Sequence, residues 1–91
     1  MALIELRRFH LRGGVDEARW RDVDEEAQAV AHTQPGLLRR TTARRADGSG
    51  GWLVIELWRS SADADGRPDP DPALEVVDPA TLAVERYATL D

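Results

Sequence analysis

Residues 52–58 read Trp-Leu-Val-Ile-Glu-Leu-Trp, and this stretch decides the fold. Its aromatic and β-branched residues favour a β-strand, in which successive side chains point to opposite faces. One face then carries Leu53, Ile55 and Leu57. The other face carries Trp52, Val54, Glu56 and Trp58. Because both faces are largely apolar, the sheet that contains this strand needs a covering layer on each side.

The segment before this strand predicts a β-hairpin. Residues 37–45 form a second strand-like run, and Asp-Gly-Ser-Gly-Gly at positions 47–51 is a turn signal between the two runs. The second run carries Arg39, Arg40, Arg44 and Arg45. These arginines could bind an anion, or they could protect an exposed sheet edge from pairing with other chains. We favour the second explanation, because charge on an edge strand is the usual protection.

Towards the N-terminus, the sequence predicts a strand followed by a helix. Residues 2–11 are rich in strand formers. From Asp16, a suitable N-cap, apolar residues recur at helical spacing, and Pro35-Gly36 ends the helix. The apolar stripe of this helix consists of Trp20, Val23, Ala27, Val30 and Ala31.

Towards the C-terminus, the pattern weakens. Residues 62–72 end in alternating proline and aspartate, which excludes a helix there and predicts an exposed loop. Residues 73–77 could form one short helical turn, and residues 82–90 alternate as a fourth strand. The order β-α-β-β-(α)-β, with a short or broken second helix, predicts an α+β fold of the ferredoxin-like type. Its four-stranded antiparallel sheet would have one face covered by the helix and the other open.

The composition fits a single small domain, residues 1–91. A core of this size is thin, so cover from a partner subunit is plausible. The formal net charge of −5 argues against a nucleic-acid partner. No apolar run reaches the roughly 20 residues of a membrane span, and we recognise no secretory signal. The chain contains no cysteine for disulfides or thiolate metal sites, and we expect it in the cytoplasm.

Strand alternation gathers the candidate site residues. If Ile4 and Leu6 face the helix, the odd-numbered side chains of the first strand face the open side. We expect the pocket on this open face to be lined by Arg7, Phe9, Trp52, Glu56, Trp58 and Tyr87. Aromatic walls with a few charged groups are typical of a small-molecule pocket. The same face could instead be a dimer core, in which Glu5, Arg7 and Glu56 form an ion-pair network.

Three short motifs resemble those of a known family. They are Gln-Pro-Gly-Leu-Leu at 34–38, Val-Ile-Glu-Leu-Trp-Arg-Ser at 54–60 and Val-Glu-Arg-Tyr at 84–87. With the element order, they make the chain similar to the antibiotic biosynthesis monooxygenase-like proteins of the dimeric α+β barrel superfamily. This resemblance implies a homodimer in which two ferredoxin-like protomers pair through their open sheet faces. The chain departs from the family in the second crossover, where members usually have a full helix.

The resemblance argues against haem degradation, which some members of the superfamily perform. Those members use an Asn on the first strand, a Trp at the end of the third strand and a His on the second helix. The Trp position falls on Trp58, but the Asn position falls at or near Arg7 and the chain has no Asn. No His follows His32.

Other members are cofactor-independent oxygenases of aromatic, polyketide-type compounds. The resemblance therefore implies a cofactor-independent monooxygenase or cyclase that needs no metal, with an aromatic small molecule as its ligand. The candidate catalytic residues are Arg7, Trp58 and Tyr87, and the candidate substrate-binding residues are Phe9, Trp52 and Glu56. Arg7 would stabilise an anionic oxygen, the tryptophans would stack on the ring, and Tyr87 would donate a proton. The alternative is a non-catalytic ligand-binding or assembly protein whose open face is only a dimer core.

Overall fold

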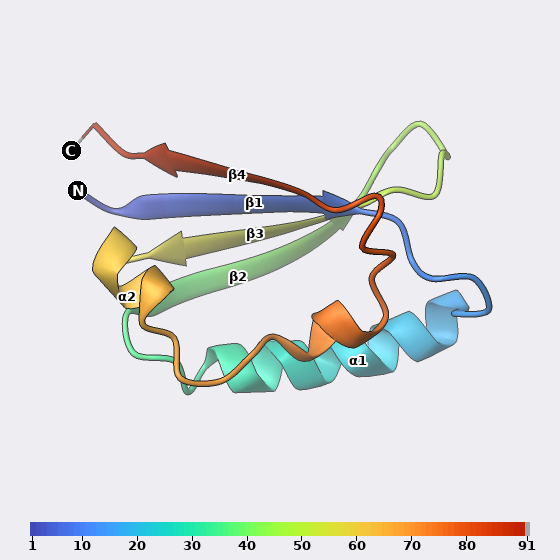
Figure 1. The fold of residues 1–91 in the computed structure, drawn as a ribbon, viewed down its shortest axis with the longest axis horizontal. Helices are drawn as coiled ribbons and strands as arrows, with labels where there is room; N and C mark the ends of the chain where they lie inside the picture. Colours follow the sequence, from blue (N-terminus) through green and yellow to red (C-terminus); the bar gives the residue numbers. More distant parts are fainter. Residues whose placement is uncertain (91) are drawn as a thin grey trace.

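The four strands form one antiparallel sheet in the order β2-β3-β1-β4. The computed structural model describes residues 1–90, and Asp91 lies outside this description. The strands are β1 (Leu3–Phe9), β2 (Leu37–Arg44), β3 (Trp52–Trp58) and β4 (Ala83–Ala88) (Figure 1). The sheet order and the β-α-β-β-α-β sequence of elements confirm the predicted ferredoxin-like α+β fold.

Helix α1 (Glu17–Ala31) begins and ends close to the predicted positions. Asp16 is its N-cap, and the carboxylate of Asp16 accepts a hydrogen bond from the backbone N–H of Arg19 at 2.8 Å. The buried residues of the helix are Trp20, Val23, Ala27 and Ala31. They belong to the predicted apolar stripe, and Trp20 contacts both Phe9 and Trp52 in the sheet.

The second crossover contains two short helical segments, α2 (Ser61–Asp65) and the 3-10 helix η1 (Pro72–Glu75). Residues 66–71 join them without regular structure. The prediction of an exposed loop over 62–72 is therefore wrong in two respects. Ser60 caps a helical turn at the start of this stretch, and Asp71 at its end is only 4% exposed. The predicted turn over 73–77 corresponds to η1, which begins one residue earlier.

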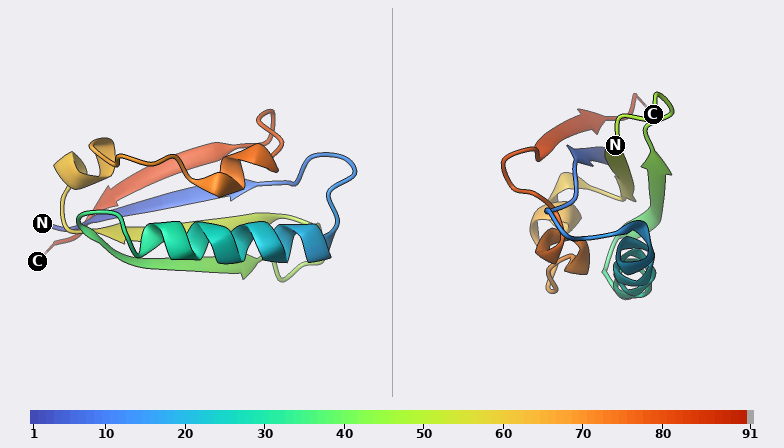
Figure 2. Two further views of the ribbon diagram at one scale, coloured as in Figure 1. Left: turned by 90° about the horizontal axis from the view of Figure 1, so that it is seen from below. Right: turned by 90° about the vertical axis from the view of Figure 1, so that its right-hand side faces the viewer.

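The orientation of the sheet is opposite to the predicted one. Figure 2 shows α1, α2 and η1 on the same side of the sheet. This side carries Phe9 and Val54, which belong to one buried cluster with Trp20 of α1. The prediction that Ile4 and Leu6 face the helix is wrong, because strand alternation shows which residues share a face but not which face is covered. The open face carries Ile4, Leu6, Leu53, Ile55 and Leu57.

The covered face of the sheet has three zones. One apolar cluster lies at the end of the sheet where Phe9 pairs with Trp52, and a smaller one lies where Leu3 pairs with Trp58. Between these clusters the covered face carries charged side chains. This middle zone, packed beneath the second crossover, contains the candidate functional site.

Candidate functional site

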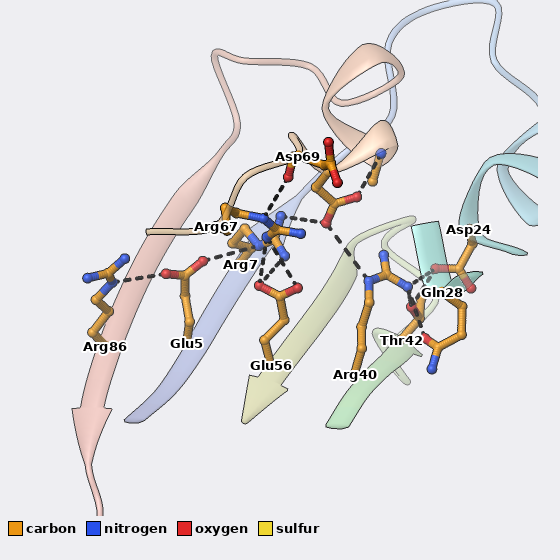
Figure 3. Close-up of polar contacts among 12 residues, drawn as sticks. Glu5, Arg7, Asp24, Gln28, Arg40, Thr42, Glu56, Arg67, Asp69 and Arg86 are labelled. Atoms are coloured by element: carbon orange, nitrogen blue, oxygen red, sulfur yellow. Dashed lines mark hydrogen bonds and ion pairs between the residues drawn. The ribbon is translucent and has the colours of Figure 1, made fainter. Parts of the chain in front are cut away.

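A row of charged residues crosses the sheet in the middle of its covered face. The strand register places Arg40 opposite Glu56, Glu56 opposite Glu5, and Glu5 opposite Arg86. The row therefore contains one side chain from each of the four strands. Figure 3 shows these side chains with Arg7, which lies two residues further along β1 and points between the two glutamates.

Arg7 is the centre of this cluster. Its guanidinium lies 2.7 Å from Glu56, 2.7 Å from Asp71 and 3.5 Å from Glu5, measured between nitrogen and carboxylate oxygen. The Glu56 side chain is 0% exposed and that of Arg7 is 8% exposed. Charged groups at this depth are stable only when they are paired, so the contacts of Arg7 hold the cluster together. The predicted ion-pair network of Glu5, Arg7 and Glu56 exists, but it lies under the helical layer rather than on the open face.

Arg67 covers the cluster from the second crossover. Its Nη1 lies 3.3 Å from a Glu56 carboxylate oxygen, and its guanidinium carbon lies 5.5 Å from the ring centroid of Trp58. Glu56 thus pairs with two arginines, one from the sheet and one from the crossover. Trp58 is 1% exposed and lies beneath a cation.

Arg40 reaches this cluster from the edge strand β2. Its Nη1 donates to the carboxylate of Asp24 at 2.7 Å, and its Nε lies 3.9 Å from the carboxylate of Asp71. Because the Arg40 side chain is only 1% exposed, the explanation that it protects the sheet edge is wrong for this residue. The other three arginines of that run are exposed.

Asp71, in the second crossover, connects β1 and β2 because its carboxylate contacts both Arg7 and Arg40. One of its carboxylate oxygens accepts from Arg7, and the other accepts from the backbone N–H of Ala73 at 2.9 Å. Burial alone would raise the pKa of Asp71. The guanidinium of Arg7, the hydrogen bond from Ala73 and the guanidinium of Arg40 outweigh that effect, so the pKa of Asp71 lies below its ordinary value. Asp71 is therefore an anion held by two buried cations.

Of the buried donors on the covered face that have no hydrogen-bond acceptor within residues 1–90, two also lie outside every ion pair. They are Nη2 of Arg40 and the indole Nε1 of Trp58. A buried N–H without an acceptor costs free energy, and native proteins usually satisfy such groups. The covered face thus offers donors that an anionic or carbonyl oxygen could use.

Five of the six predicted site residues lie on the covered face, but they are not all close together. Three of them lie in or next to the charged middle zone. Arg7, Glu56 and Trp58 form this group, whereas Phe9 and Trp52 lie together at the opposite end. Tyr87 pairs with Ile4 and therefore lies on the open face, where its hydroxyl donates to Glu85. The structure does not bring Tyr87 together with the other five residues.

A separate pocket of about 390 Å³ lies at the end of the sheet beside the β2–β3 hairpin. Its lining combines the aromatic rings of Phe9 and Trp52 with polar groups. The other lining residues are Arg8, His10, Arg45, Gly51, Leu53 and Thr81. Its volume lies in the range of roughly 300–1,000 Å³ that is usual for small-molecule pockets. No residue of the charged row lines it.

Sequence reasoning did not place Arg67 and Asp71 in the site, and it favoured edge protection over anion binding for Arg40. A partial signal exists for Asp71, because a carboxylate followed by proline can cap a 3-10 turn and so take a fixed place. Within the described residues, no group of three His, Cys, Asp or Glu side chains is placed to hold a metal ion. No helix in the part of the chain that the structure describes is long and apolar enough to cross a membrane.

Comparison with known proteins supports the fold assignment. No protein-family model matches the sequence, and a search of curated proteins finds no match. Among solved structures, SnoaB, a cofactor-independent oxygenase from Streptomyces nogalater, matches with a TM-score of 0.77 and 20% identity over 99% of this chain and 94% of its own. Rv0793 from Mycobacterium tuberculosis matches with a TM-score of 0.76 and 20% identity over 100% of this chain and 97% of its own.

A third structure comes from Caulobacter crescentus, and its assignment as an antibiotic biosynthesis monooxygenase is provisional. It matches with a TM-score of 0.79 and 16% identity over 99% of this chain and 91% of its own. At these identities the comparisons establish the fold alone. The expected likeness to antibiotic biosynthesis monooxygenase-like proteins is thus confirmed at the level of the fold, which this chain shares with SnoaB.

Proposed function

We propose that this protein binds an aromatic, polyketide-type molecule against the covered face of its sheet and oxidises it with O₂ without a cofactor. The observation that carries the proposal is that two buried donors on the covered face, Arg40 Nη2 and Trp58 Nε1, have no hydrogen-bond acceptor within residues 1–90, and that this face also holds the buried guanidinium of Arg7. SnoaB, which has the same fold, is a cofactor-independent oxygenase.

The chemistry that these residues could support is the stabilisation of a carbanion. An aromatic carbon acid loses a proton from carbon to water, the negative charge moves to its conjugated oxygen, and a proton returns from water when the peroxide forms. Arg7 and the Trp58 indole N–H would bind that oxygen more strongly as its charge grows, which lowers the barrier to deprotonation. The carbanion then reacts with O₂ to give a hydroperoxide. Loss of water from the hydroperoxide converts the CH₂ group into a ketone, so that one O₂ is consumed and one H₂O is released.

Oxygen uptake with anthrone as the carbon acid tests this proposal. We expect one O₂ consumed for each ketone formed, without added cofactor. Trp58→Phe and Arg7→Lys should each slow this turnover by about 100-fold, the usual effect of losing one donor to a developing oxyanion. Tyr87→Phe is the matched control, because Tyr87 lies on the other face, and it should retain wild-type turnover. Oxygen uptake no faster than the uncatalysed oxidation would contradict the proposal.

A second candidate function rests on the same cluster. Arg7 is already paired with Glu5, Glu56 and Asp71, which favours a non-catalytic ligand-binding or assembly protein. In that case the cluster is a structural network, and aromatic ligands bind without turnover. Anthrone binding with no oxygen uptake would support this second function.

The proposed active form is a homodimer. The open face presents five aliphatic side chains from the two central strands, each only partly covered within one chain. A second copy that packs its own open face there would supply the layer that the apolar strand β3 lacks.

A further inference from the structure

The Asp71 carboxylate occupies a position that two strands of the sheet prepare for an anion. Arg7 of β1 and Arg40 of β2 converge on the same oxygen of this carboxylate, at 2.7 and 3.9 Å. The two arginines flank β3 and are both almost fully buried. Each arginine has another carboxylate partner at 2.7 Å, Glu56 for Arg7 and Asp24 for Arg40, and within residues 1–90 Asp71 is the one carboxylate that both share.

The fit of Asp71 to this position is incomplete. Only one of its oxygens faces the guanidinium groups, because the other accepts the backbone N–H of Ala73. Within the described chain, Nη2 of Arg40 has no acceptor, and Asp71 does not satisfy it. An anion with two free oxygens could use donors that the Asp71 carboxylate leaves unused.

Asp71 comes from a connection that is not part of the sheet. Residues 66–71 have no helix or strand, and the side chains of Arg67 and Asp71 tie them to the sheet by ion pairs. The segment that follows is fixed in the core by Ala73, Val76 and Val77. Asp71 is the N-cap of η1, whereas the core contacts of η1 come from the residues after it, so a displacement of Asp71 would have to move residues 66–71 and give up the bond to Ala73.

We propose that Asp71 is an internal substitute for the ligand, and that an aromatic molecule bearing a carboxylate or enolate displaces it from Arg7 and Arg40. The anionic oxygens then lie between the two guanidinium groups, and the aromatic ring extends towards Trp58. This inference rests on the proposed function, because it assigns a charge to the ligand of the same site.

The chain contains a matched control for Asp71. The sequence Asp-Pro-Ala occurs at residues 71–73 and again at residues 78–80. The carboxylate of Asp78 accepts the N–H of Ala80 at 3.1 Å, as that of Asp71 accepts the N–H of Ala73. No arginine within residues 1–90 forms an ion pair with Asp78, so Asp78→Ala removes the same type of turn contact and no arginine partner.

Calorimetric titration with benzoate, under anaerobic conditions, tests the inference. Benzoate has the required ring and carboxylate and cannot be turned over by the proposed oxidation, so its binding is independent of oxygenase activity. Asp71→Ala removes the competing carboxylate, and we expect it to bind benzoate about tenfold more tightly than wild type, as when a closed state limits affinity. Asp78→Ala should bind like wild type. Benzamide, which lacks the charge, should show no gain in Asp71→Ala.

A second variant, Asp71→Asn, keeps an oxygen for Ala73 and is decisive if Asp71→Ala does not fold. It too should bind benzoate more tightly than wild type. Equal benzoate affinity in wild type and in every folded Asp71 variant would overturn the inference. An equal gain in Asp78→Ala, or with benzamide, would also overturn it. Tighter benzoate binding without any oxygen uptake from anthrone would retain the anion site and reject only the oxygenase proposal.

Discussion

At the scale of single residues, the main feature is a charged cluster in the place where a small protein usually keeps apolar side chains. Arg7, Glu56 and Asp71 are all buried between the sheet and the second crossover. Replacing such a cluster with apolar residues is often neutral or stabilising, so its presence points to a role other than stability. Removing one member alone is different, because it leaves its partner buried and unpaired.

The pH dependence of stability should reveal the contribution of Asp71. Because its pKa is lowered in the folded state, its contribution is complete above its ordinary pKa of 3.8 and is lost as the pH falls through the folded value. We expect Asp71→Asn to lower the free energy of unfolding by about 3 kcal/mol at neutral pH. The difference from wild type should shrink below about pH 4. Urea titrations across this range measure it, and a difference that does not change with pH would show that the charge of Asp71 is not responsible.

The residue scale is where the sequence was least informative. Alternation correctly placed Arg7, Glu56 and Trp58 on one face of the sheet. It could not show that this face is the covered one, because charged residues are rarely buried unless they are paired. The partner that makes burial possible, Asp71, lies 64 positions from Arg7, and no local pattern connects them.

At the scale of elements, the turn between α1 and β2 and the short helix α2 support each other. Gly36 has a φ of 80°, which favours glycine, and its carbonyl accepts the N–H of Arg59 at 2.7 Å. A Cβ at Gly36 would lie 2.4 Å from the carboxyl group of Asp63 in α2. That carboxylate is held by Arg59 and by the hydroxyl of Ser60. The glycine thus lets α2 lie directly against the turn.

Gly36→Ala should therefore destabilise the protein through both backbone strain and the displacement of α2. We expect the free energy of unfolding to fall by about 2 kcal/mol, measured by urea denaturation. Gly13→Ala is the control, because an added Cβ at Gly13 has no atom within 4 Å. If the two variants lose the same stability, the contact between the turn and α2 does not matter for folding.

The elements with a clear periodicity of apolar residues could be predicted from the sequence, and the short elements could not. The stripe on α1 and the alternation in β3 gave their positions within a few residues. Helix α2 has only five residues, which is too short to show a period, although Ser60 and Asp63 have the spacing of an N-cap. The Pro-Asp run correctly excluded a long helix but did not show that Asp71 points inward.

At the scale of the whole molecule, one face of the sheet lacks a covering layer. The central open-face residues Leu6 and Ile55 are paired across β1 and β3 and are only partly buried. Within residues 1–90 most ion pairs lie away from this face, and the pair of Arg8 with Glu85 lies on it. The apolar face is therefore the surface with the most to gain from association.

Light scattering should show that the chain of 10.1 kDa has twice this mass at micromolar concentration. Ile55→Glu places a charge in the centre of the open face and should give a monomer, because a buried unpaired carboxylate is strongly unfavourable. Leu74→Glu is the matched control, since Leu74 is 45% exposed on the opposite side in η1 and should leave the dimer intact. A wild-type monomer, or a dimer that persists in Ile55→Glu, would reject pairing through this face.

The position of β1 has a consequence for the time at which the sheet can form. β1 is the first strand of the chain, yet it lies inside the sheet, between β3 and β4. As the chain leaves the ribosome, β1 emerges with both of its hydrogen-bonding edges unpaired, whereas β2 and β3 emerge together with their turn. β1 therefore has no strand partner until residues 52–58 have been synthesised. Its second edge stays unpaired until residues 83–88 follow.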